Sequence, residues 1–277
     1  MFAQSATMAN NACDTTYPVL PVELEQNIVE IAAFMIISFP LSCTSCALEL
    51  QLTAQRFREW TMPFLYRVLH ANSFSAGRTE SESTEILNRY GKHIRHFFFG
   101  WDIQKSLEAL KRSPMVQSIV NWNVHTEFEE MHSAVQHTSS LRRLSIFVGT
   151  LKPELLSSPV YCNITHIEIA GFLADPNVLV RLPNLTHLCI YISHDVADFN
   201  VLLDPGRKPL IQVVVYFNHY PQVRPADARV IKLKRLDTYT EVEDQWMRNP
   251  NGEMDFWELA ERMVYARRGT FFSISSY

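Results

Sequence analysis

The sequence has little glycine and carries none of the short motifs that mark common catalytic or nucleotide-binding sites. Glycine makes up 8 of 277 residues, below the average share of about 7%, which argues against glycine-built phosphate loops. The patterns G-x-x-x-x-G-K-[ST], G-x-G-x-x-G, G-x-S-x-G and H-E-x-x-H are all missing. We therefore expect no catalytic residues, no cofactor and no resident metal. A small enzyme of unknown class is the least favoured alternative.

The chain also has no large excess of acidic or basic side chains. The chain has 25 basic and 29 acidic side chains, a formal net charge of -4, so no overall field attracts nucleic acid or an anionic membrane. We expect neither as a partner. The 5 cysteines are odd in number and scattered, and residues 1–16 lack a basic, apolar signal sequence, so they are expected to form a disordered leader. These features together favour a reducing compartment, the cytoplasm or the nucleus.

One uncharged run raises the question of a membrane span. Residues 31–48 contain no charged side chain, which is just long enough for a transmembrane helix. Pro40 divides the run, and no basic residue anchors either end, so we interpret it as two buried helices joined by a turn. Cys43 and Cys46 within it form a lone C-x-x-C, which lacks the further ligands of a zinc site.

The first part of the chain, residues 17–70, is predicted to be helical. Leu24, Ile28 and Ile31 recur at the spacing of one helix face, and Pro21 lies near the start of that helix, where proline is tolerated. A second helix is expected over residues 47–60. The polar stretch 71–91 follows as a linker with a short helix.

The two ends of this helical part resemble an F-box. The family pattern Leu-Pro-x-Glu-Leu-x-x-x-Ile stands here as Leu20, Pro21, Glu23, Leu24 and Ile28. A basic and aromatic stretch at residues 56–60 and a Pro-x-Leu-Tyr at residues 63–66 match its end. The chain is similar in this to the F-box-like proteins of mushroom-forming fungi. The resemblance implies that Leu20, Pro21, Leu24 and Ile28 bind a Skp-type adaptor and, through it, a cullin.

A strand pattern h-x-x-h-x-h, where h is apolar, recurs through residues 92–236. Its starts are Ile94, Val116, Leu141, Ile164, Leu185, Leu210 and Val230, at intervals of 20 to 25 residues. Leucine-rich repeats have units of this length, each with one strand and a helical or irregular return. Residues 102–112 and 126–138 have helical patterning and would be two such returns. We therefore predict an α/β fold: F-box-like helices, then a short, irregular leucine-rich-repeat-like solenoid with a parallel sheet. A generic α/β layer is the alternative.

Residues 237–277 are predicted to form a helical cap. Asn251 is the expected N-cap of the last helix, whose apolar side would be Phe256, Ala260, Met263 and Val264. Asp255-Phe256-Trp257 also resembles the C-terminal end of the fungal F-box-like proteins. A solenoid needs such a cap to shield its last core layer.

If the h positions point into the core, the residues between them line the opposite face of the sheet. Eight side chains there form the predicted target-binding face: Trp122, Arg143, Phe147, His166, Glu168, His187, Tyr191 and Tyr216. Exposed aromatic side chains commonly anchor protein partners, although a helix or loop of the same chain could cover them instead. His166 and His187, with Glu168 or Cys189 nearby, could also converge on zinc, but chance adjacency among the 10 histidines is the favoured explanation.

The sequence therefore predicts a non-catalytic substrate-recognition subunit of a Skp-cullin-F-box type ubiquitin ligase, with an unidentified protein target. The alternative is an interaction scaffold of the same fold that does not bind the adaptor.

Overall fold

The computed structural model describes residues 21, 23–24, 26–29, 55–147, 151–171, 176–191, 203–204, 206, 211–217, 227–233, 239–248, 250 and 253–269. The predicted leader, the turn at Pro40 and the Cys43/Cys46 pair lie outside these residues. No helix in the described part of the chain has the length and apolar character that crossing a membrane requires.

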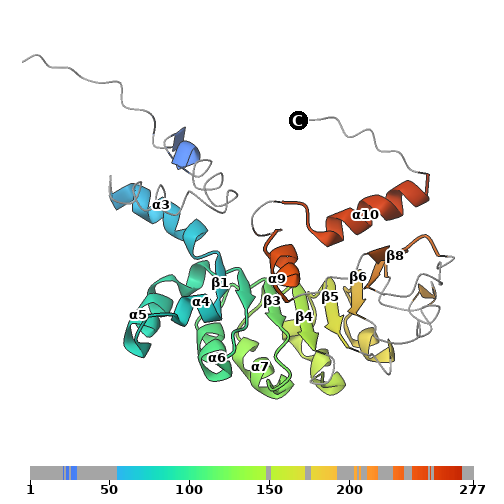
Figure 1. Ribbon diagram of the computed structural model, residues 1–277, viewed down its shortest axis with the longest axis horizontal. Coiled ribbons are helices and arrows are strands. Elements are labelled where there is room, and N and C mark those ends of the chain that lie inside the picture. Colours follow the sequence, from blue (N-terminus) through green and yellow to red (C-terminus); the bar gives the residue numbers. More distant parts are fainter. Residues whose placement is uncertain are drawn as a thin grey trace, which may run out of the picture.

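Eight strands of the described residues form one all-parallel sheet, in which the spatial order of the strands is their order in the chain (Figure 1). The strands are β1 (Val68–His70), β2 (His96–Phe98), β3 (Ser118–Asn121), β4 (Arg143–Phe147), β5 (His166–Ala170), β6 (His187–Tyr191), β7 (Val213–Phe217) and β8 (Val230–Leu233). The predicted α/β class and parallel sheet are confirmed.

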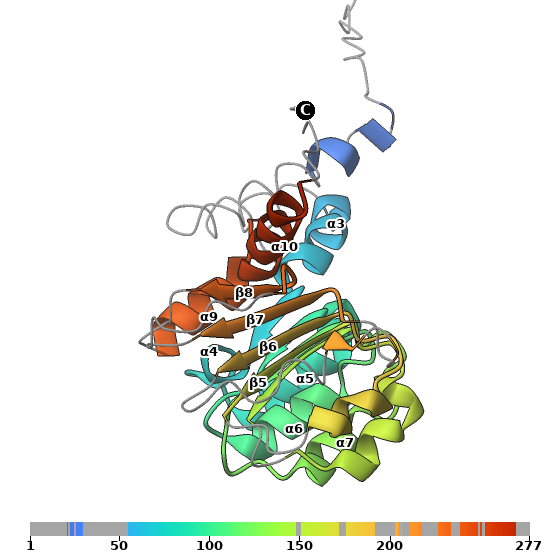
Figure 2. The same ribbon diagram turned by 90° about the vertical axis from the view of Figure 1, so that its right-hand side faces the viewer.

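Helices and short 3-10 turns connect and flank the strands. They are α3 (Gln55–Leu65), α4 (Ala71–Ser75), α5 (Glu80–Tyr90), η1 (Gly91–His93), α6 (Ile103–Lys111), α7 (Phe128–Val135), η3 (Pro153–Ser157), η4 (Pro159–Tyr161), η5 (Pro176–Arg181), α9 (Tyr239–Arg248) and α10 (Phe256–Arg267). Helices α5, α6 and α7 cover one face of the sheet, and α9 and α10 lie on the other (Figures 1 and 2).

Local sequence explains where the connecting helices begin. Thr79 and Glu82 form a capping box at α5, in which the Glu82 backbone N–H donates to Thr79 Oγ1 at 3.3 Å and the Thr79 N–H donates to Glu82 Oε2 at 2.8 Å. Asp102 accepts from the Lys105 N–H at 3.1 Å and caps α6 in the same way. The predicted return helices over residues 102–112 and 126–138 are present as α6 and α7.

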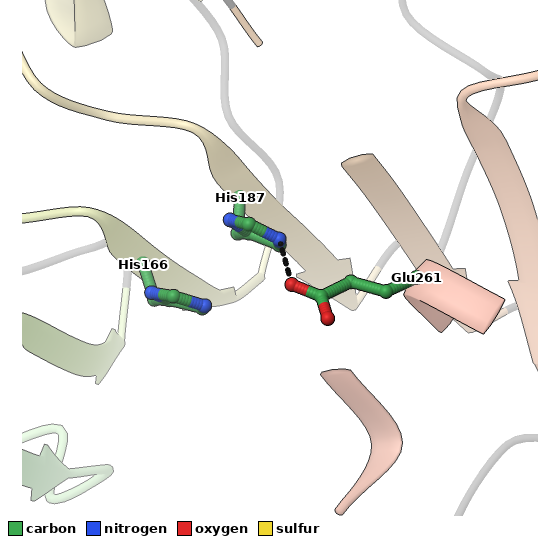
Figure 3. A group of neighbouring side chains, drawn as sticks. All are labelled: His166, His187 and Glu261. Atoms are coloured by element: carbon green, nitrogen blue, oxygen red, sulfur yellow. Dashed lines mark hydrogen bonds and ion pairs between the residues drawn. The ribbon is translucent and has the colours of Figure 1, made fainter. Parts of the chain in front are cut away.

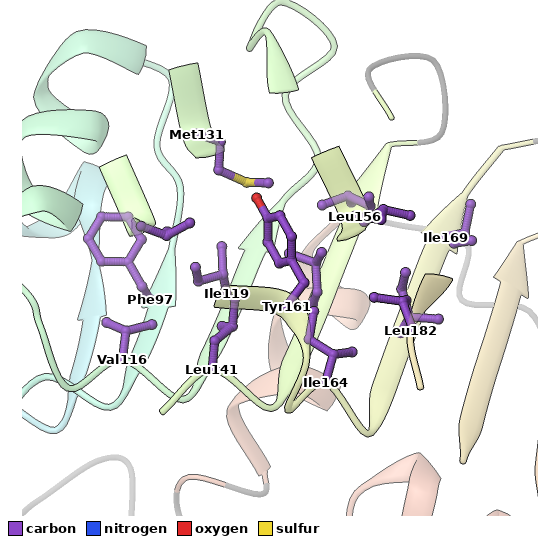
Figure 4. Packing of buried hydrophobic residues seen from close by; sticks show 14 of the residues in the cluster. Phe97, Val116, Ile119, Met131, Leu141, Leu156, Tyr161, Ile164, Ile169 and Leu182 are labelled. Carbon is purple, nitrogen blue, oxygen red and sulfur yellow. The ribbon is translucent and has the colours of Figure 1, made fainter. Parts of the chain in front are cut away.

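The main core lies between the sheet and its helical face (Figure 4). Most of the predicted h positions belong to it: in β4 to β6 and the residues before them they are Leu141, Leu144, Ile146, Ile164, Ile167, Ile169, Leu185, Leu188 and Ile190. Tyr161 fills the space under α7, where its ring lies 5.7 Å from that of Phe128. The repeated pattern therefore has a single physical cause, which is burial of one side of each strand.

The strand β7 departs from the predicted phase by one residue. Its register pairs Val213 with His187 and Val214 with Leu188, so Val214 and Tyr216 point into the main core. The prediction that Leu210, Val213 and Val215 do so is wrong at the two valines. All five residues of β7 are buried, and a strand that is apolar on both faces shows no alternation from which the phase could be determined.

The first strand was not predicted. Residues 68–70 fall in the part predicted to be helical, but they form β1 and pair with β2. The polar stretch 71–91 then folds as α4 and α5, and the short helix expected in it is α5, which ends at its cap residue Gly91. A strand of three residues is too short to show a period of two, which is why the sequence pattern did not indicate it.

Gly91, which follows α5, offers a sharp test of this packing. A Cβ at residue 91 would overlap the carbonyl oxygen of Arg112. We expect Gly91→Ala to lower the free energy of unfolding by about 1–3 kcal/mol, the usual cost of overpacking. Glu85→Ala is the control, because Glu85 is an exposed residue of α5 whose truncation should change stability by no more than about 0.5 kcal/mol. Urea unfolding of both variants measures the difference, and equal losses would contradict the packing described.

Candidate recognition face under the last helix

The sheet face turned toward α9 and α10 carries most of the polar and aromatic side chains that the sequence singles out. We call it the α10 face. Strand register arranges its residues in three rows: His96, Ser118, Arg143, His166, His187 and Val213; then Phe98, Val120, Ser145, Glu168, Cys189 and Val215; then Phe147, Ala170, Tyr191 and Phe217. Each row runs across neighbouring strands, so residues distant in sequence become neighbours.

An ion pair fixes the start of α10 to the sheet. Arg143 Nη1 on β4 donates to Asp255 Oδ2 at 2.9 Å, and the other Asp255 oxygen accepts from the Glu258 N–H at 2.9 Å. Asp255 is therefore the N-cap of α10, four residues later than the predicted Asn251. The reason is that Asp255 is buried and completes both interactions at once, with the sheet and with the helix.

The two histidines of the first row stack on each other. The imidazole rings of His166 and His187 lie 4.1 Å apart with an angle of 10° between them. The Trp257 ring of α10 lies nearly perpendicular to both, with ring centres 5.2 and 5.7 Å away. Burial lowers the pKa of His166 to about 2, and burial lowers the pKa of His187 although Glu261 opposes the shift. Both imidazoles are therefore neutral at neutral pH.

Glu261 of α10 completes this cluster. Its Oε1 lies 2.8 Å from Nε2 of His187 (Figure 3). The Nδ1 atoms on the other side of the rings lie 2.8 Å from Thr165 Oγ1 in His166 and 2.7 Å from Thr186 Oγ1 in His187. Each ring is thus held by the threonine that precedes it in the chain, and the two Nε2 atoms point the same way.

Aromatic residues occupy the carboxyl ends of the strands. The Trp122 indole N–H donates to Ser145 Oγ at 2.6 Å, and its ring lies edge-on to Tyr191 at 5.2 Å. The Tyr191 hydroxyl donates to Glu168 Oε1 at 2.7 Å. Burial raises the pKa of Glu168, so this carboxyl gives up its proton less readily than an exposed one. Trp122, Phe147 and Tyr191 are each partly exposed, so this part of the face is accessible.

The centre of the face encloses only a small cavity. It lies between His96, Arg143 and His166 of the sheet and Trp246, Asp255 and Trp257 of the C-terminal segment, and it measures about 20 Å³. That volume suits one water molecule and excludes a metabolite. Cys189 is fully buried, and burial raises the pKa of its thiol well above the usual value, which disfavours a nucleophilic role.

His96 beside this cavity gives the site a pH dependence. Burial lowers its pKa to about 3, with Arg67, Arg143 and Arg95 adding to the shift. Below pH 6.5 the unfolded chain therefore binds a proton that the folded chain refuses, and stability falls as the pH falls. We expect His96→Gln to reduce the stability lost between pH 7 and pH 5 by about 2 kcal/mol. Urea unfolding at both pH values measures this, with the exposed His125→Gln as control. The assignment fails if the two variants behave alike.

The structure brings seven of the eight predicted target-binding residues to the α10 face. Tyr216 is the exception, and its placement there is wrong: it pairs with Ile190 and packs in the main core on the other side of the sheet. The cause is the shifted phase of β7. Among the predicted adaptor-binding residues, Leu20 lies outside the described residues, whereas Pro21, Leu24 and Ile28 are all exposed.

Sequence reasoning missed the partners that α10 contributes. Asp255, Trp257 and Glu261 cover the centre of the face, so Arg143 and His187 interact with the chain's own last helix. The recurrence of Asp255, Glu258 and Glu261 at helical spacing was a signal of a charged helix side, but it did not specify what that side would meet.

All of the contacts described for the fold and the α10 face are made between residues of this chain. No model of a known protein family matches the sequence, and a comparison with curated proteins finds no significantly similar one.

Proposed function

We propose that this protein is a non-catalytic substrate-recognition subunit of a Skp-cullin-F-box type ubiquitin ligase. Its N-terminal helical segment would bind the Skp-type adaptor, and its repeats would hold a protein target. The observation that carries the proposal is a pair of exposed apolar side chains at the F-box-like positions.

Leu24 and Ile28 form that pair. They are 49% and 55% exposed, although both are large apolar side chains, whereas the neighbouring Val29 is buried. Both lie on helical residues one turn apart, after a turn closed by the Leu24 N–H donating to the Pro21 carbonyl at 2.9 Å. Two adjacent exposed apolar groups on one helix side are what a partner helix would bury.

The sheet supports a solenoid architecture. Its strand order follows the chain without reversal from β1 to β8. A doubly wound sheet reverses its strand order at one point and binds ligands in the crevice that forms there. An unreversed order is instead what stacked strand-and-return repeats produce. This favours the leucine-rich-repeat-like solenoid and a binding surface over a metabolite site.

The accessible aromatic part of the α10 face is the best candidate for contact with a target. Trp122 and Tyr191 lie edge to face and Tyr191 stacks on Phe217 at 4.6 Å, so the rings are held before any partner binds. Large aromatic side chains fixed in advance lose little entropy on binding. The receptor would add no chemistry of its own. It would raise the effective concentration of a target lysine near the ubiquitin-loaded enzyme.

The experiment that tests the proposal is co-purification of the full chain with the Skp-type adaptor. The wild type is expected to elute with the adaptor at equal stoichiometry, and a Pro21→Ala/Leu24→Asp variant to lose the complex, because a carboxylate replaces an apolar side chain that the complex would bury. Val180→Asp is the matched control, since Val180 is an apolar residue with 48% exposure elsewhere on the surface.

Circular dichroism and thermal melting establish that each variant is folded. Loss of the complex in the folded double variant, with binding retained by Val180→Asp, supports the ligase subunit. A well-folded wild type that does not bind the adaptor rejects it, and leaves an interaction scaffold with an F-box-like segment.

A further inference from the structure

His166, His187 and Glu261 come from three separate elements and converge at one point of the α10 face. The histidines lie on β5 and β6 and the glutamate on α10, and one nitrogen or oxygen atom from each lies within 4.8 Å of the other two. Figure 3 shows both rings directed toward the carboxylate. Two imidazoles and a carboxylate are a ligand set that zinc binds in proteins.

The two threonines can fix the ring proton on Nδ1 of each histidine. Thr165 Oγ1 lies 3.4 Å from the Arg142 carbonyl oxygen, and Thr186 Oγ1 lies 3.2 Å from the Thr165 carbonyl oxygen. When each hydroxyl donates to that carbonyl, it accepts the Nδ1–H of the following histidine. The proton is then on Nδ1, and the Nε2 lone pair of each ring is free to bind an ion. Metal-binding histidines are generally fixed in this way by a partner on their other nitrogen.

With the ring protons on Nδ1, the negative charge of the Glu261 carboxylate has no proton donor on His187. With its proton on Nδ1, His187 would present a lone pair at Nε2 to Glu261 Oε1, only 2.8 Å away. Two acceptors at that distance repel each other unless a cation lies between them. The nearby Arg143 does not serve, because its guanidinium is bonded to Asp255 at 2.9 Å. In that tautomer the cluster offers the negative charge and the lone pairs of a cation site.

We propose that His166 Nε2, His187 Nε2 and a Glu261 carboxylate oxygen bind one divalent transition-metal ion, with zinc the best fit. Zinc bonds of 2.0–2.1 Å place tetrahedral ligands about 3.3 Å apart, so the 2.8 Å separation of His187 Nε2 and Glu261 Oε1 widens slightly on binding. The two imidazole rings, which are stacked nearly parallel, tilt toward each other to meet the ion. Glu261 can adjust its position to the ion, because its side chain is 40% exposed. The exposed side also gives the ion a path from solvent and allows water to complete the coordination. The bound ion ties α10 to β5 and β6.

Zinc titration of the full chain tests the site. The protein is first dialysed against a chelator and then titrated with zinc chloride, with metal content measured by mass spectrometry and stability by thermal melting. One zinc ion per chain and a higher melting temperature are expected. Cobalt(II) in place of zinc should give the visible absorption of a tetrahedral complex with nitrogen and oxygen ligands.

Matched variants locate the ion. Glu261→Gln should weaken zinc binding at least about tenfold, and Thr186→Val by about 10- to 100-fold, the usual effect of removing a group that orients a ligand. Glu258→Gln, one turn earlier on α10 and similarly exposed, should leave binding unchanged, as should His125→Gln. Glu261→Gln is the decisive variant, because its exposed position allows folding even if a His187 variant does not fold.

Two outcomes overturn the proposal. The first is a chelated, folded wild type that takes up no stoichiometric zinc. In that case the Thr186 hydroxyl donates to His187 Nδ1, the Nε2–H donates to Glu261, and the cluster is a hydrogen-bonded pair. The second is zinc binding that Glu261→Gln and Thr186→Val leave unchanged, which places the ion elsewhere on the chain.

Discussion

Replacing Trp257 by alanine is expected to detach the last helix from the sheet. The Trp257 side chain is 6% exposed and packs nearly perpendicular to both stacked histidine rings, and its ring lies 4.6 Å from that of Phe256. Removing a buried tryptophan leaves a cavity that neighbouring side chains refill only in part. The expected cost is about 3–5 kcal/mol.

Hydrogen exchange of the α10 amides is the appropriate measurement, because the helix can open without unfolding of the whole sheet. Leu259→Ala on the same helix is the control: Leu259 is 41% exposed, and its truncation should change stability by no more than about 0.5 kcal/mol. Comparable losses of protection in the two variants would show that α10 is not held through its tryptophan.

The second large effect is expected at Asp255. Asp255→Ala removes the N-cap of α10, worth about 1 kcal/mol, and leaves the Arg143 guanidinium without its carboxylate, worth about 1–3 kcal/mol more. Asp255→Asn separates the two contributions, because asparagine is an equally good N-cap but carries no charge. We expect the alanine variant to lose about 2–4 kcal/mol and the asparagine variant about 1–3 kcal/mol. Urea unfolding measures both, and variants indistinguishable from wild type would refute the ion pair as an anchor.

The repeated half of the fold could be predicted from the sequence because one physical requirement recurs in it. Each strand from β2 to β6 buries the same side against helical returns, so the h-x-x-h-x-h pattern repeats. Strand β7 lies outside this argument: it is buried on both faces, by the main core and by Phe256, Trp257, Ala260 and Val264 of α10. Its apolar run fits either phase, and the error at Tyr216 follows from that ambiguity.

The site was harder to predict than the fold. The rows of the α10 face follow from strand register, which explains why Arg143, His166 and His187 could be named in advance. Their partners could not be named, because Asp255 is 112 residues from Arg143 and Glu261 is 74 residues from His187. Helix periodicity identified most of the apolar side of α10 but left out Trp257. It contains no information on whether that side packs on the face of the sheet or on the end of the last repeat.

Covering of the face by α10 also divides the predicted recognition surface in two. Arg143, His166 and His187 stabilise the last helix, whereas Trp122, Phe147 and Tyr191 remain partly exposed beside it. The proposed target would therefore meet mainly the aromatic end of the strands. Substituting Trp122 would be expected to affect target binding with α10 still in place.

The central claim, that the N-terminal segment binds the adaptor while the repeats remain available for a target, is tested most directly by hydrogen–deuterium exchange of the full chain with and without the Skp-type adaptor. We predict that the adaptor protects backbone amides around Leu24 and Ile28 and leaves exchange in β3 to β6 unchanged. Protection confined to the strands of the α10 face, or no protection anywhere at saturating adaptor, would contradict the account.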